Sequence, residues 1–491
     1  MSSGIKRLAG ETVIYGLSTI IGRLLNWLLI PALYVRTNTT EEIGALGEIL
    51  AFAAILLVIF TYGLETGFFR FSKDEDKKDV YKTTMMMLTV SSSALILLTL
   101  IFAPNFSNFL GAGKHLSSLY LVGIIIALDS FISIPFAKLR LENKAFKFAI
   151  IKIINISLII LFNFTFLLII PYFIKNNSLP QQIIDIYNSQ DKLFYIFLSN
   201  LIASASMFLF FIKDLKNLSG KFNKNIAKRM LRYSLPVLLV GLTGMIIQNS
   251  DRLLMSKLVE SDGMMQTGLY TVNFKIGVLM SLYTQSFRFS FEPFFFKNRE
   301  KGKEAYSKAM EYFVFFGMFI FLSITLFLDV INMLITNKYA EGNIIIPFVL
   351  IGFLFFGIYY NLSLWYKLTD KTIWGVYFGV AGMSITLTLN FLLVPKIGII
   401  GGAIALASGY FVMMVMSYLK GRKVYPVDYD LKKIGIYFFS ALIFYLTYRY
   451  ANFEIKVFDN ILRVCILVFY VYIFFKIKKA KITFYKNNSV N

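Results

Sequence analysis

The sequence is poor in the residues from which soluble folds and reactive sites are usually built. Its one cysteine, Cys465, excludes a disulfide framework and a cysteine-based metal cluster. Its one histidine, His115, excludes a metal site built from several histidine ligands. Only 16% of the residues are charged, against about 25% in soluble proteins. A soluble globular fold is therefore not expected.

Signatures of enzymes are also scarce. No Walker lysine motif is present, and Asp428-Tyr429-Asp430, which has the form of a glycosyltransferase metal motif, stands alone in a short basic loop. Lys6 and Arg7 precede a long apolar stretch without a small-residue cleavage site, so no removable signal peptide is predicted. We expect no metal, no cofactor and no enzymatic activity.

Apolar residues, by contrast, are abundant and occur in long blocks. They make up 57% of the 491 residues, and the mean hydropathy is +0.66. A block of roughly 20 residues can cross a hydrocarbon layer of about 30 Å as an α-helix, and no block alternates as a barrel strand does. The sequence therefore predicts an all-α integral membrane protein. Fourteen spans are predicted, at residues 9–34, 43–69, 83–104, 116–137, 148–172, 193–212, 231–258, 269–295, 311–335, 344–366, 373–395, 399–419, 434–451 and 457–475.

The net charge of +22 agrees with this topology. With the N-terminus inside, and with residues within three positions of a span end counted with the adjoining loop, the cytoplasmic segments hold 35 of the 50 Lys and Arg residues and the outer loops hold nine. Cytoplasmic loops of membrane proteins carry such an excess of basic residues. Both termini are therefore predicted to be cytoplasmic, and the charge does not require a nucleic-acid partner.

A weak repeat divides the chain into halves. Gly16-Leu17-Ser18 recurs as Gly241-Leu242-Thr243, and Gly44 matches Gly268, at offsets of 225 and 224 residues. Six spans per half give both halves the same orientation, so two parallel six-helix lobes plus two C-terminal helices are predicted. The predicted divisions are an N-terminal lobe at 1–212, a basic cytoplasmic linker at 213–230, a C-terminal lobe at 231–420, and helices 13 and 14 with a cytoplasmic tail at 421–491.

Basic residues inside the spans are candidates for substrate binding, because a charge in hydrocarbon is costly and usually faces a cavity or a partner. Arg23 lies near the middle of the first span, too deep to reach either interface easily. Arg252, Lys275 and Arg288 are the other candidates. For Arg288 the alternative is an interfacial position, which we also expect for Arg463 near a span end.

Deep carboxylates are candidates for coupling or for ion pairs. Glu65, Asp129 and Asp251 lie inside spans, and Glu292 follows Arg288 by four residues, so these two can pair on one helix face. A desolvated carboxylate can bind a proton in one conformation and release it in another. A fixed salt bridge to one of the basic residues is the alternative for each of them.

Several segments resemble one known family. They are residues 62–71, 134–143, 233–236 with Asp251-Arg252, and 270–275 continuing to 286–296. Together they are similar to the polysaccharide-biosynthesis flippases of the multidrug/oligosaccharidyl-lipid/polysaccharide exporter superfamily. The resemblance covers residues 10–420, and its strongest part is the segment from 270 to 296. Helices 13 and 14 also match the branch of the superfamily that handles lipid-linked sugars.

The resemblance implies a carrier in the bacterial cytoplasmic membrane. It would move an undecaprenyl-pyrophosphate-linked oligosaccharide, such as an O-antigen or exopolysaccharide repeat unit, across the membrane by alternating access. The partners implied are this polyprenyl-linked glycan, membrane lipid and proteins of glycan polymerisation and assembly. A proton gradient, a sodium gradient or the membrane potential would drive transport.

Three alternatives stay open at the level of sequence. The chain can be a lipid II flippase, a drug/cation antiporter of the same superfamily, or a membrane enzyme acting on polyprenyl sugars. An antiporter is expected to have mainly acidic cavity residues, whereas deep basic residues are at least as prominent here. An enzyme is expected to carry long outer loops with polar catalytic residues, and the longest outer loop, 173–192, is poor in them.

The predicted topology can be tested with reporter fusions. A reporter fused after Asn177 should report the outer side and one after Asn491 the cytoplasm, because nine spans separate the two positions. A fusion in the basic loop 213–230 is the matched control for a cytoplasmic site. If the fusions at Asn177 and Asn491 report the same side, the number of spans between them is wrong.

Overall fold

The computed structural model describes residues 20–110, 113–216, 218–297, 302–369, 371–450 and 456–488. The described residues are almost entirely helical and include no β-strand, which confirms the predicted all-α fold. The chain forms two compact units, and each is described by itself. Unit 1 comprises Met1–Val272 and Gly379–Ala405, and unit 2 comprises Asn273–Phe378 and Leu406–Asn491. The predicted lobes and linker remain a prediction.

The helices follow one another with short connections. After a helix through residues 20–29, the elements up to the middle of the chain are η1 (Ile30–Tyr34), α2 (Val35–Thr37), α3 (Thr40–Thr61), α4 (Leu64–Phe71), α5 (Lys77–Phe109), η2 (Gly113–His115), α6 (Leu116–Leu141), α7 (Ala145–Phe164), η3 (Thr165–Ile169), α8 (Ile170–Lys175), α9 (Gln181–Asn188), α10 (Lys192–Lys216) and α11 (Lys224–Leu258). The later elements are α12 (Gly263–Lys297), α13 (Gly302–Leu326), α14 (Leu328–Ile335), η4 (Asn337–Ile345), α15 (Ile346–Leu362), α16 (Leu364–Leu368), α17 (Ile373–Val424), α18 (Leu431–Tyr450) and α19 (Lys456–Asn488).

Every predicted span falls mainly on helical residues where the structure describes it, although Tyr62 and Gly63 interrupt the span 43–69 between α3 and α4. Ten helices of the described part are long and apolar enough to cross a membrane. The other predicted spans lie in the helical residues 20–37, in α12, in α18 and in the second half of α17. The protein is therefore a multi-pass membrane protein.

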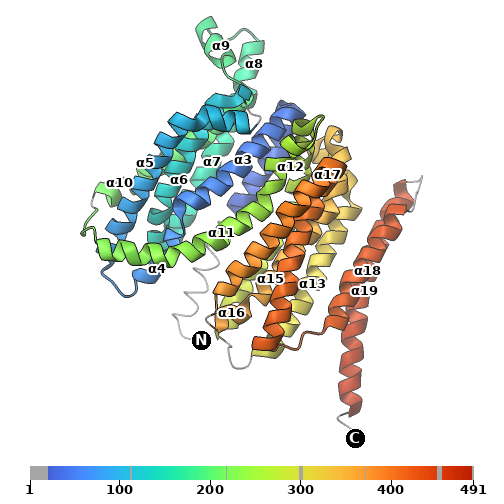
Figure 1. The fold of residues 1–491 in the computed structure, drawn as a ribbon. Coiled ribbons are helices and arrows are strands. Elements are labelled where there is room, and N and C mark those ends of the chain that lie inside the picture. Colours follow the sequence, from blue (N-terminus) through green and yellow to red (C-terminus); the bar gives the residue numbers. More distant parts are fainter. Residues whose placement is uncertain are drawn as a thin grey trace. The chain divides into compact units, whose positions relative to one another are not determined.

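Unit 1 is a bundle with an aromatic interior. Within it α5 packs on α6, α10 packs on α6 and α7, and α11 packs on α3 and α4; the parallel course of α3, α5, α6 and α7 can be followed in Figure 1. The ring of Phe136 lies edge-on to Phe148 and Phe211, with centroids 5.4 and 5.2 Å apart. Edge-to-face pairs at this spacing stabilise a core beyond the area that they bury.

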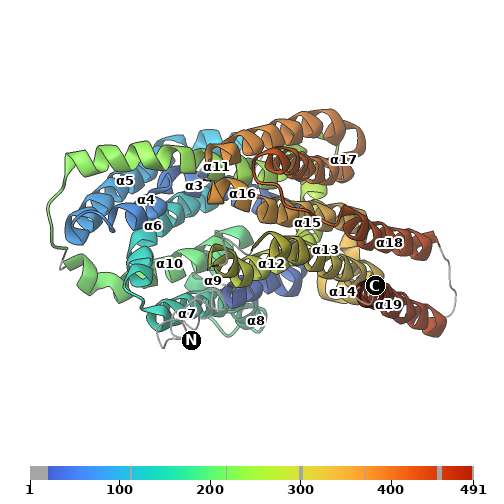
Figure 2. The same ribbon diagram turned by 90° about the horizontal axis from the view of Figure 1, so that it is seen from below.

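Unit 2 is built around α13. This helix packs on α15, α18 and α19, and α18 and α19 lie side by side (Figure 2). Phe315 of α13 stacks on Tyr470 and Phe474 of α19, at centroid distances of 5.2 and 4.1 Å. Helix α19 is thus fixed to α13 by stacked rings.

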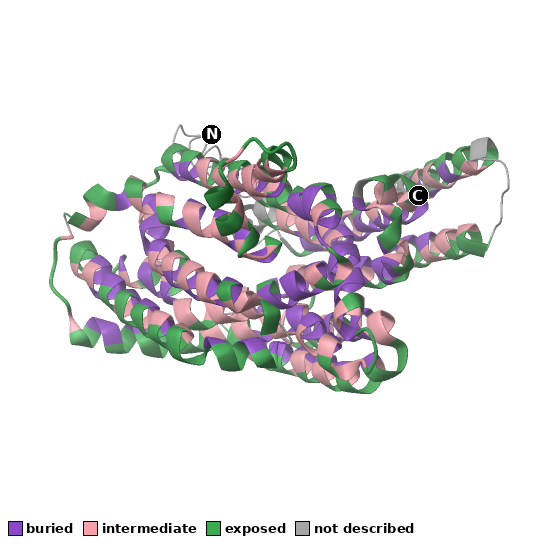
Figure 3. Cartoon of the chain, turned by 90° about the horizontal axis from the view of Figure 1, so that it is seen from above, coloured by how far each residue is buried: buried purple, intermediate pink, exposed green. Residues whose placement is uncertain are grey.

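The outward faces of the helices are apolar. In α5, Val90, Leu97 and Ile101 are 71%, 60% and 64% exposed, and in α19 Val468 is 63% exposed. Exposed residues follow the outer faces of the helices in Figure 3. Exposure of such surfaces to water is unfavourable, whereas lipid chains solvate them, so these faces are suited to contact with lipid.

The outer loop after α7 is folded. Helices α8 and α9 project beyond the other helices of unit 1 (Figure 1). Tyr187 of α9 stacks on Tyr195 at 4.5 Å and donates to the carbonyl of Phe166 at 2.7 Å, and burial raises the pKa of Tyr187 to about 12. Nearby, His115 is paired with Asp191. Burial raises the pKa of Asp191, but hydrogen bonds from His115 and from the backbone lower it by more, so its pKa lies below the ordinary value.

The predicted break between spans 11 and 12 is confirmed, because two helices meet there within α17. The backbone is non-helical at the break, with Ile397 at φ −132° and Gly398 at φ +52°. Glycine enters this left-handed region without steric cost. The kink is tight because a Cβ at residue 398 would come within 2.2 Å of the Gln266 side chain.

Helices α3 and α12 cross at the glycines of the predicted repeat. A Cβ on Gly44 would lie 2.1 Å from the carbonyl oxygen of Met264, and one on Gly268 would lie 2.0 Å from that of Thr40. Gly47 packs in the same way on Thr271. Small residues allow two membrane helices to approach this closely. Gly44 and Gly268, which match each other in the sequence repeat, thus face each other across one contact.

Substitution of Gly268 tests this crossing. We expect Gly268→Ala to destabilise the protein by about 1–3 kcal/mol, the usual cost of overpacking, and so to lower its Tm in detergent. Gly244→Ala is the matched control, because a Cβ added to this α11 glycine would have no atom within 4 Å, and alanine is the better helix former. An unchanged Tm for Gly268→Ala would contradict the close crossing.

Candidate functional site

Five charged residues of unit 1 form what we call the N-terminal charge cluster. They are Arg23, Glu65, Asp129, Arg140 and Lys152, and Lys152 interacts electrostatically with each of the other four. Glu65 and Arg140 form a direct ion pair between α4 and α6. Arg23, Asp129 and Lys152 are exposed on unit 1. The cluster therefore brings together three of the residues predicted from sequence and has one cation in excess.

The cations of the cluster lie on aromatic rings. The Lys152 ammonium is 4.3 Å from the centroid of Phe136, and the Arg140 guanidinium is 5.1 Å from that of Phe69. Asp129 is hydrogen-bonded to Ser204 of α10. Such contacts hold a cation in place without fully neutralising it. The arrangement can therefore stabilise the fold and still attract an anion.

A second group lies on α11 and is closed. Asp251 is 1% exposed and accepts a hydrogen bond from Tyr270. Arg252 is 6% exposed, and its guanidinium donates to the carbonyl of Gln248 at 2.7 Å and to Asn249 Oδ1 at 2.8 Å. The Arg252 Nε also lies 3.5 Å from Asp251 Oδ1. Both residues are thus engaged inside unit 1, and their roles in binding and coupling remain predictions.

Glu48 of α3 is a buried carboxylate that the sequence analysis did not single out. It is 0% exposed, and its Oε1 accepts hydrogen bonds from Ser256 at 3.0 Å and from the Lys257 ammonium. Its Oε2 is buried without a hydrogen-bond partner. The sequence does contain a signal for each residue, because Glu48 is a charged residue inside the predicted span 43–69 and Lys257 is one at the end of span 231–258. Nothing in the sequence, however, joins two residues that are 209 positions apart.

Two predicted basic residues lie on the part of α12 that belongs to unit 2. Lys275 is half-buried, and its neighbour Asn273 donates to the carbonyl of Tyr339 at 2.9 Å. Arg288 is exposed, and its guanidinium lies 4.4 Å from the centroid of the Tyr360 ring. The side chain of Glu292 lies outside the described residues, so the predicted pair with Arg288 remains a prediction.

Tyr360 and Lys367 were not identified from the sequence. The Lys367 ammonium lies 4.2 Å from the Tyr360 ring centroid and donates to the phenol oxygen at 2.9 Å. Tyr360 of α15 therefore has a cation from α12 and a cation from α16 against the same ring. A tyrosine near the end of an apolar span gives no sequence signal of such a role.

Arg463 corrects an expectation. It is only 7% exposed, whereas an interfacial position was expected. Its guanidinium donates to Asp329 at 2.6 Å and to Tyr448 at 2.8 Å, and it also pairs with Asp459. Polar partners on three helices solvate the Arg463 charge in place of water. Arg463 therefore fixes α19 to α14 and α18.

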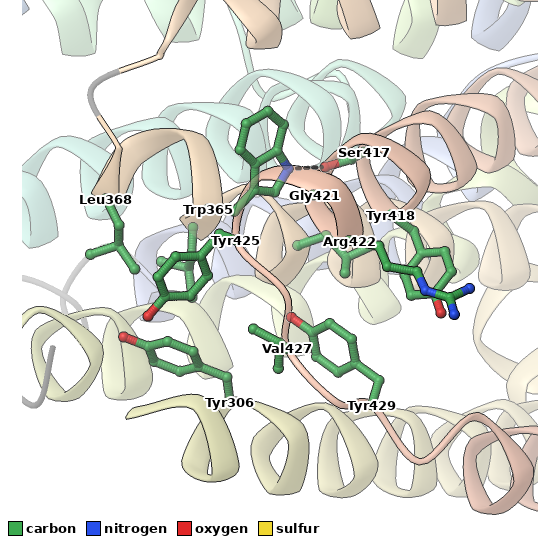
Figure 4. Close-up of a pocket in the computed structure, with 12 residues that line it drawn as sticks. Tyr306, Trp365, Leu368, Ser417, Tyr418, Gly421, Arg422, Tyr425, Val427 and Tyr429 are labelled. Carbon is green, nitrogen blue, oxygen red and sulfur yellow. Dashed lines mark hydrogen bonds between the residues drawn. The ribbon is translucent and has the colours of Figure 1, made fainter. Parts of the chain in front are cut away.

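The Asp-x-Asp pattern has a structural role. Asp430 accepts from the backbone N–H of Lys433 at 3.2 Å, as an N-cap of α18 does, and pairs with its ammonium at 2.8 Å. Tyr429 lines a small cavity of about 20 Å³ with Tyr306, Arg422 and Tyr425 (Figure 4). The same view shows Trp365 donating to Ser417, at 3.2 Å. This volume corresponds to about one water molecule.

Comparison with known proteins shows which proteins the chain is similar to. No protein-family profile matches it. It is 22% identical over 420 residues to the capsular polysaccharide biosynthesis protein CapF of Staphylococcus aureus, and the alignment covers 83% of this chain and 98% of CapF. An uncharacterised membrane protein of Methanocaldococcus jannaschii is 23% identical over 422 residues, covering 79% of this chain and 78% of that protein.

Solved transporters share the fold. The lipid II flippase MurJ, in an inward closed conformation, superimposes with a TM-score of 0.73 at 16% identity, over 94% of this chain and 99% of MurJ. An inward-facing multidrug resistance MATE transporter of the MOP superfamily gives 0.64 at 13% identity, over 84% and 97%. This protein is similar in sequence to CapF and shares the fold of these transporters. The resemblance noted in the sequence is thereby confirmed.

The pairing of Glu48 with Lys257 can be tested directly. Lys257→Met should destabilise the protein by about 3–5 kcal/mol, because Glu48 would remain as a buried charge without its cation. The double variant Glu48→Gln with Lys257→Met should regain much of this loss. Melting temperature and urea unfolding in detergent measure both, with Lys338→Met as an exposed lysine control. Equal losses in the single and double variants would show that Lys257 does not neutralise Glu48.

Proposed function

We propose that this protein is a flippase for an undecaprenyl-pyrophosphate-linked oligosaccharide. It would carry an O-antigen or exopolysaccharide repeat unit from the cytoplasmic to the outer leaflet of a bacterial cytoplasmic membrane, with both of its own termini in the cytoplasm. The observation that supports this most directly is the alignment with a capsular polysaccharide biosynthesis protein over 98% of that protein. The MOP superfamily fold supports alternating access as the mechanism.

The basic residues within the membrane suit an anionic headgroup. The N-terminal charge cluster has an excess cation, with Arg23 exposed, and α12 carries Lys275 and Arg288. Arginine binds phosphate oxygens with two parallel hydrogen bonds, and lysine binds them as a point charge. An inside-negative potential would favour outward movement of a negative headgroup by about 2.3 kcal/mol per charge per 100 mV. Potential-driven transport therefore accompanies this proposal.

The carboxylates offer a second form of coupling. Asp129 of the N-terminal charge cluster is exposed and interacts with Lys152. A proton or a sodium ion bound there would remove one negative charge from the cluster and strengthen its attraction for an anion. Removing the sodium gradient and the proton gradient separately in vesicles distinguishes these two drivers from the potential.

Lipid II is the second candidate substrate. The similarity to the fold of the lipid II flippase MurJ extends over 94% of this chain. Lipid II also carries a polyprenyl diphosphate, so the same basic residues would meet the same headgroup, and only the glycan differs. The drug/cation antiporter is disfavoured by the excess of exposed cations, and the polyprenyl-sugar enzyme by the capping role of Asp430.

Depletion of the protein in its own cell discriminates between these substrates. Loss of a polysaccharide flippase leads to accumulation of an undecaprenyl-diphosphate-linked repeat unit on the cytoplasmic side, and loss of a lipid II flippase leads to accumulation of lipid II. Purified protein in vesicles should then translocate the accumulated lipid, measured with a labelled glycan and an external glycosidase. Accumulation of neither lipid would refute the proposal.

Arg23 gives the sharpest residue-level prediction. Arg23→Ala should abolish translocation in vesicles without loss of folded protein, because the N-terminal charge cluster would lose its excess cation. Arg23→Lys should retain part of the activity, since it keeps the charge but not the planar fork. Lys114→Ala, a change at an exposed basic residue of η2, is the matched control and should transport normally. Normal transport by Arg23→Ala would exclude a role in binding.

A further inference from the structure

Two cations share one aromatic ring in unit 2. The Arg288 guanidinium carbon and the Lys367 ammonium lie 4.4 and 4.2 Å from the centroid of Tyr360, so the two charges are within about 9 Å of each other. Like charges repel each other, and the repulsion is stronger near hydrocarbon than in bulk water. The ring offsets part of this repulsion through its negative faces. Two cationic side chains are therefore held close together, where one anion can contact both.

The direction of the Lys367 side chain is unusual. A lysine near the cytoplasmic end of a span normally extends towards water. Lys367 instead reaches back to Tyr360, seven residues earlier in the chain and closer to the membrane interior. The helix is interrupted between them at Ser363, whose hydroxyl donates to the carbonyl of Tyr360 at 2.6 Å. The ammonium is thus placed inside the bundle end, where it adds a second positive charge beside Arg288.

We propose that Arg288, Tyr360 and Lys367 together bind the diphosphate of the polyprenyl carrier, as the first binding position on the cytoplasmic side. This inference rests on the proposed function and names where the headgroup is recognised. Arg288 supplies paired N–H donors, Lys367 a compact ammonium, and the phenol of Tyr360 a hydroxyl that can donate while it accepts from Lys367. These donors match the oxygens of a diphosphate, whereas the two positive charges would repel a cationic drug.

The position along α12 assigns an order to the binding steps. Arg288 lies thirteen residues after Lys275, which corresponds to about 20 Å along a helix. In the predicted topology α12 runs from the outer to the cytoplasmic side, and the connections after α12 and after α16 are both cytoplasmic. A headgroup from the inner leaflet would therefore meet Arg288, Tyr360 and Lys367 first and Lys275 later.

Direct binding tests the site apart from transport. The probe is undecaprenyl diphosphate, titrated into the full-length protein in nanodiscs, with undecaprenyl monophosphate and inorganic diphosphate as comparison ligands. We expect Lys367→Gln to weaken binding of undecaprenyl diphosphate about tenfold or more, and Tyr360→Phe to weaken it a few-fold because the ring stays and the hydroxyl is lost. Lys367→Arg should bind nearly as the unchanged protein does. Lys371→Gln, a change at an exposed lysine four residues on, is the control and should bind normally.

The outcomes separate the two levels of the proposal. If the unchanged protein binds undecaprenyl diphosphate and Lys367→Gln binds it equally well at an unchanged Tm, the site is structural and this inference fails, while the flippase function stands. If the unchanged protein neither binds nor translocates a polyprenyl diphosphate lipid, both fail. If inorganic diphosphate binds as tightly as undecaprenyl diphosphate, the polyprenyl chain contributes nothing to binding. The ligand would then be a free anion and not the lipid carrier, and the assignment would be overturned. If Lys367→Gln does not fold, the binding affinities of Tyr360→Phe and Lys367→Arg are compared instead. Weaker binding by Tyr360→Phe than by Lys367→Arg supports the site, and equal binding contradicts it.

Discussion

Lipid hydrocarbon offers no hydrogen-bond partner to a peptide group and no solvation to a charge, and the rest of this structure follows from that constraint. The backbone of the described spans is mainly helical, because a helix satisfies its peptide groups within the segment. Charges inside the spans are held by other charges, by aromatic rings or by polar neighbours. Arg463, surrounded by Asp329, Asp459 and Tyr448, shows the most complete replacement of water by protein.

The same contacts that make buried charges tolerable also join helices that are distant in the sequence. Glu65 and Arg140 join α4 to α6, and Glu48 and Lys257 join α3 to α11. A transporter that alternates between conformations has to exchange such pairs rather than leave one charge alone in hydrocarbon. In the proposed flippase, these charged residues would therefore stabilise the fold and also take part in the conformational change. An anionic headgroup would then replace a carboxylate as the partner of a cation in one step of the cycle.

Interruptions of the helices fall where side chains have to be positioned. The kink at Gly398 joins two spans without a loop, and the break at Ser363 precedes Lys367, whose ammonium returns to Tyr360. Gly44 and Gly268 let α3 and α12 touch through their backbones. At Gly398, Gly44 and Gly268 an added Cβ would clash with a neighbouring residue, so these positions favour glycine.

Local composition is enough to show that the protein is helical, where its spans lie, which residues carry charge into the membrane, and which superfamily it resembles. A span needs only about 20 apolar residues in a row, so it can be read from one stretch of sequence. Which charges meet is settled by tertiary packing. Glu48 was overlooked because its partner Lys257 is 209 residues away, and Tyr360 because an aromatic residue in an apolar span has no distinguishing signal. Arg252 and Arg463 were recognised as charges, but only the packed neighbours revealed that both are enclosed. Pairing depends on distances between helices, and one sequence carries no record of these distances.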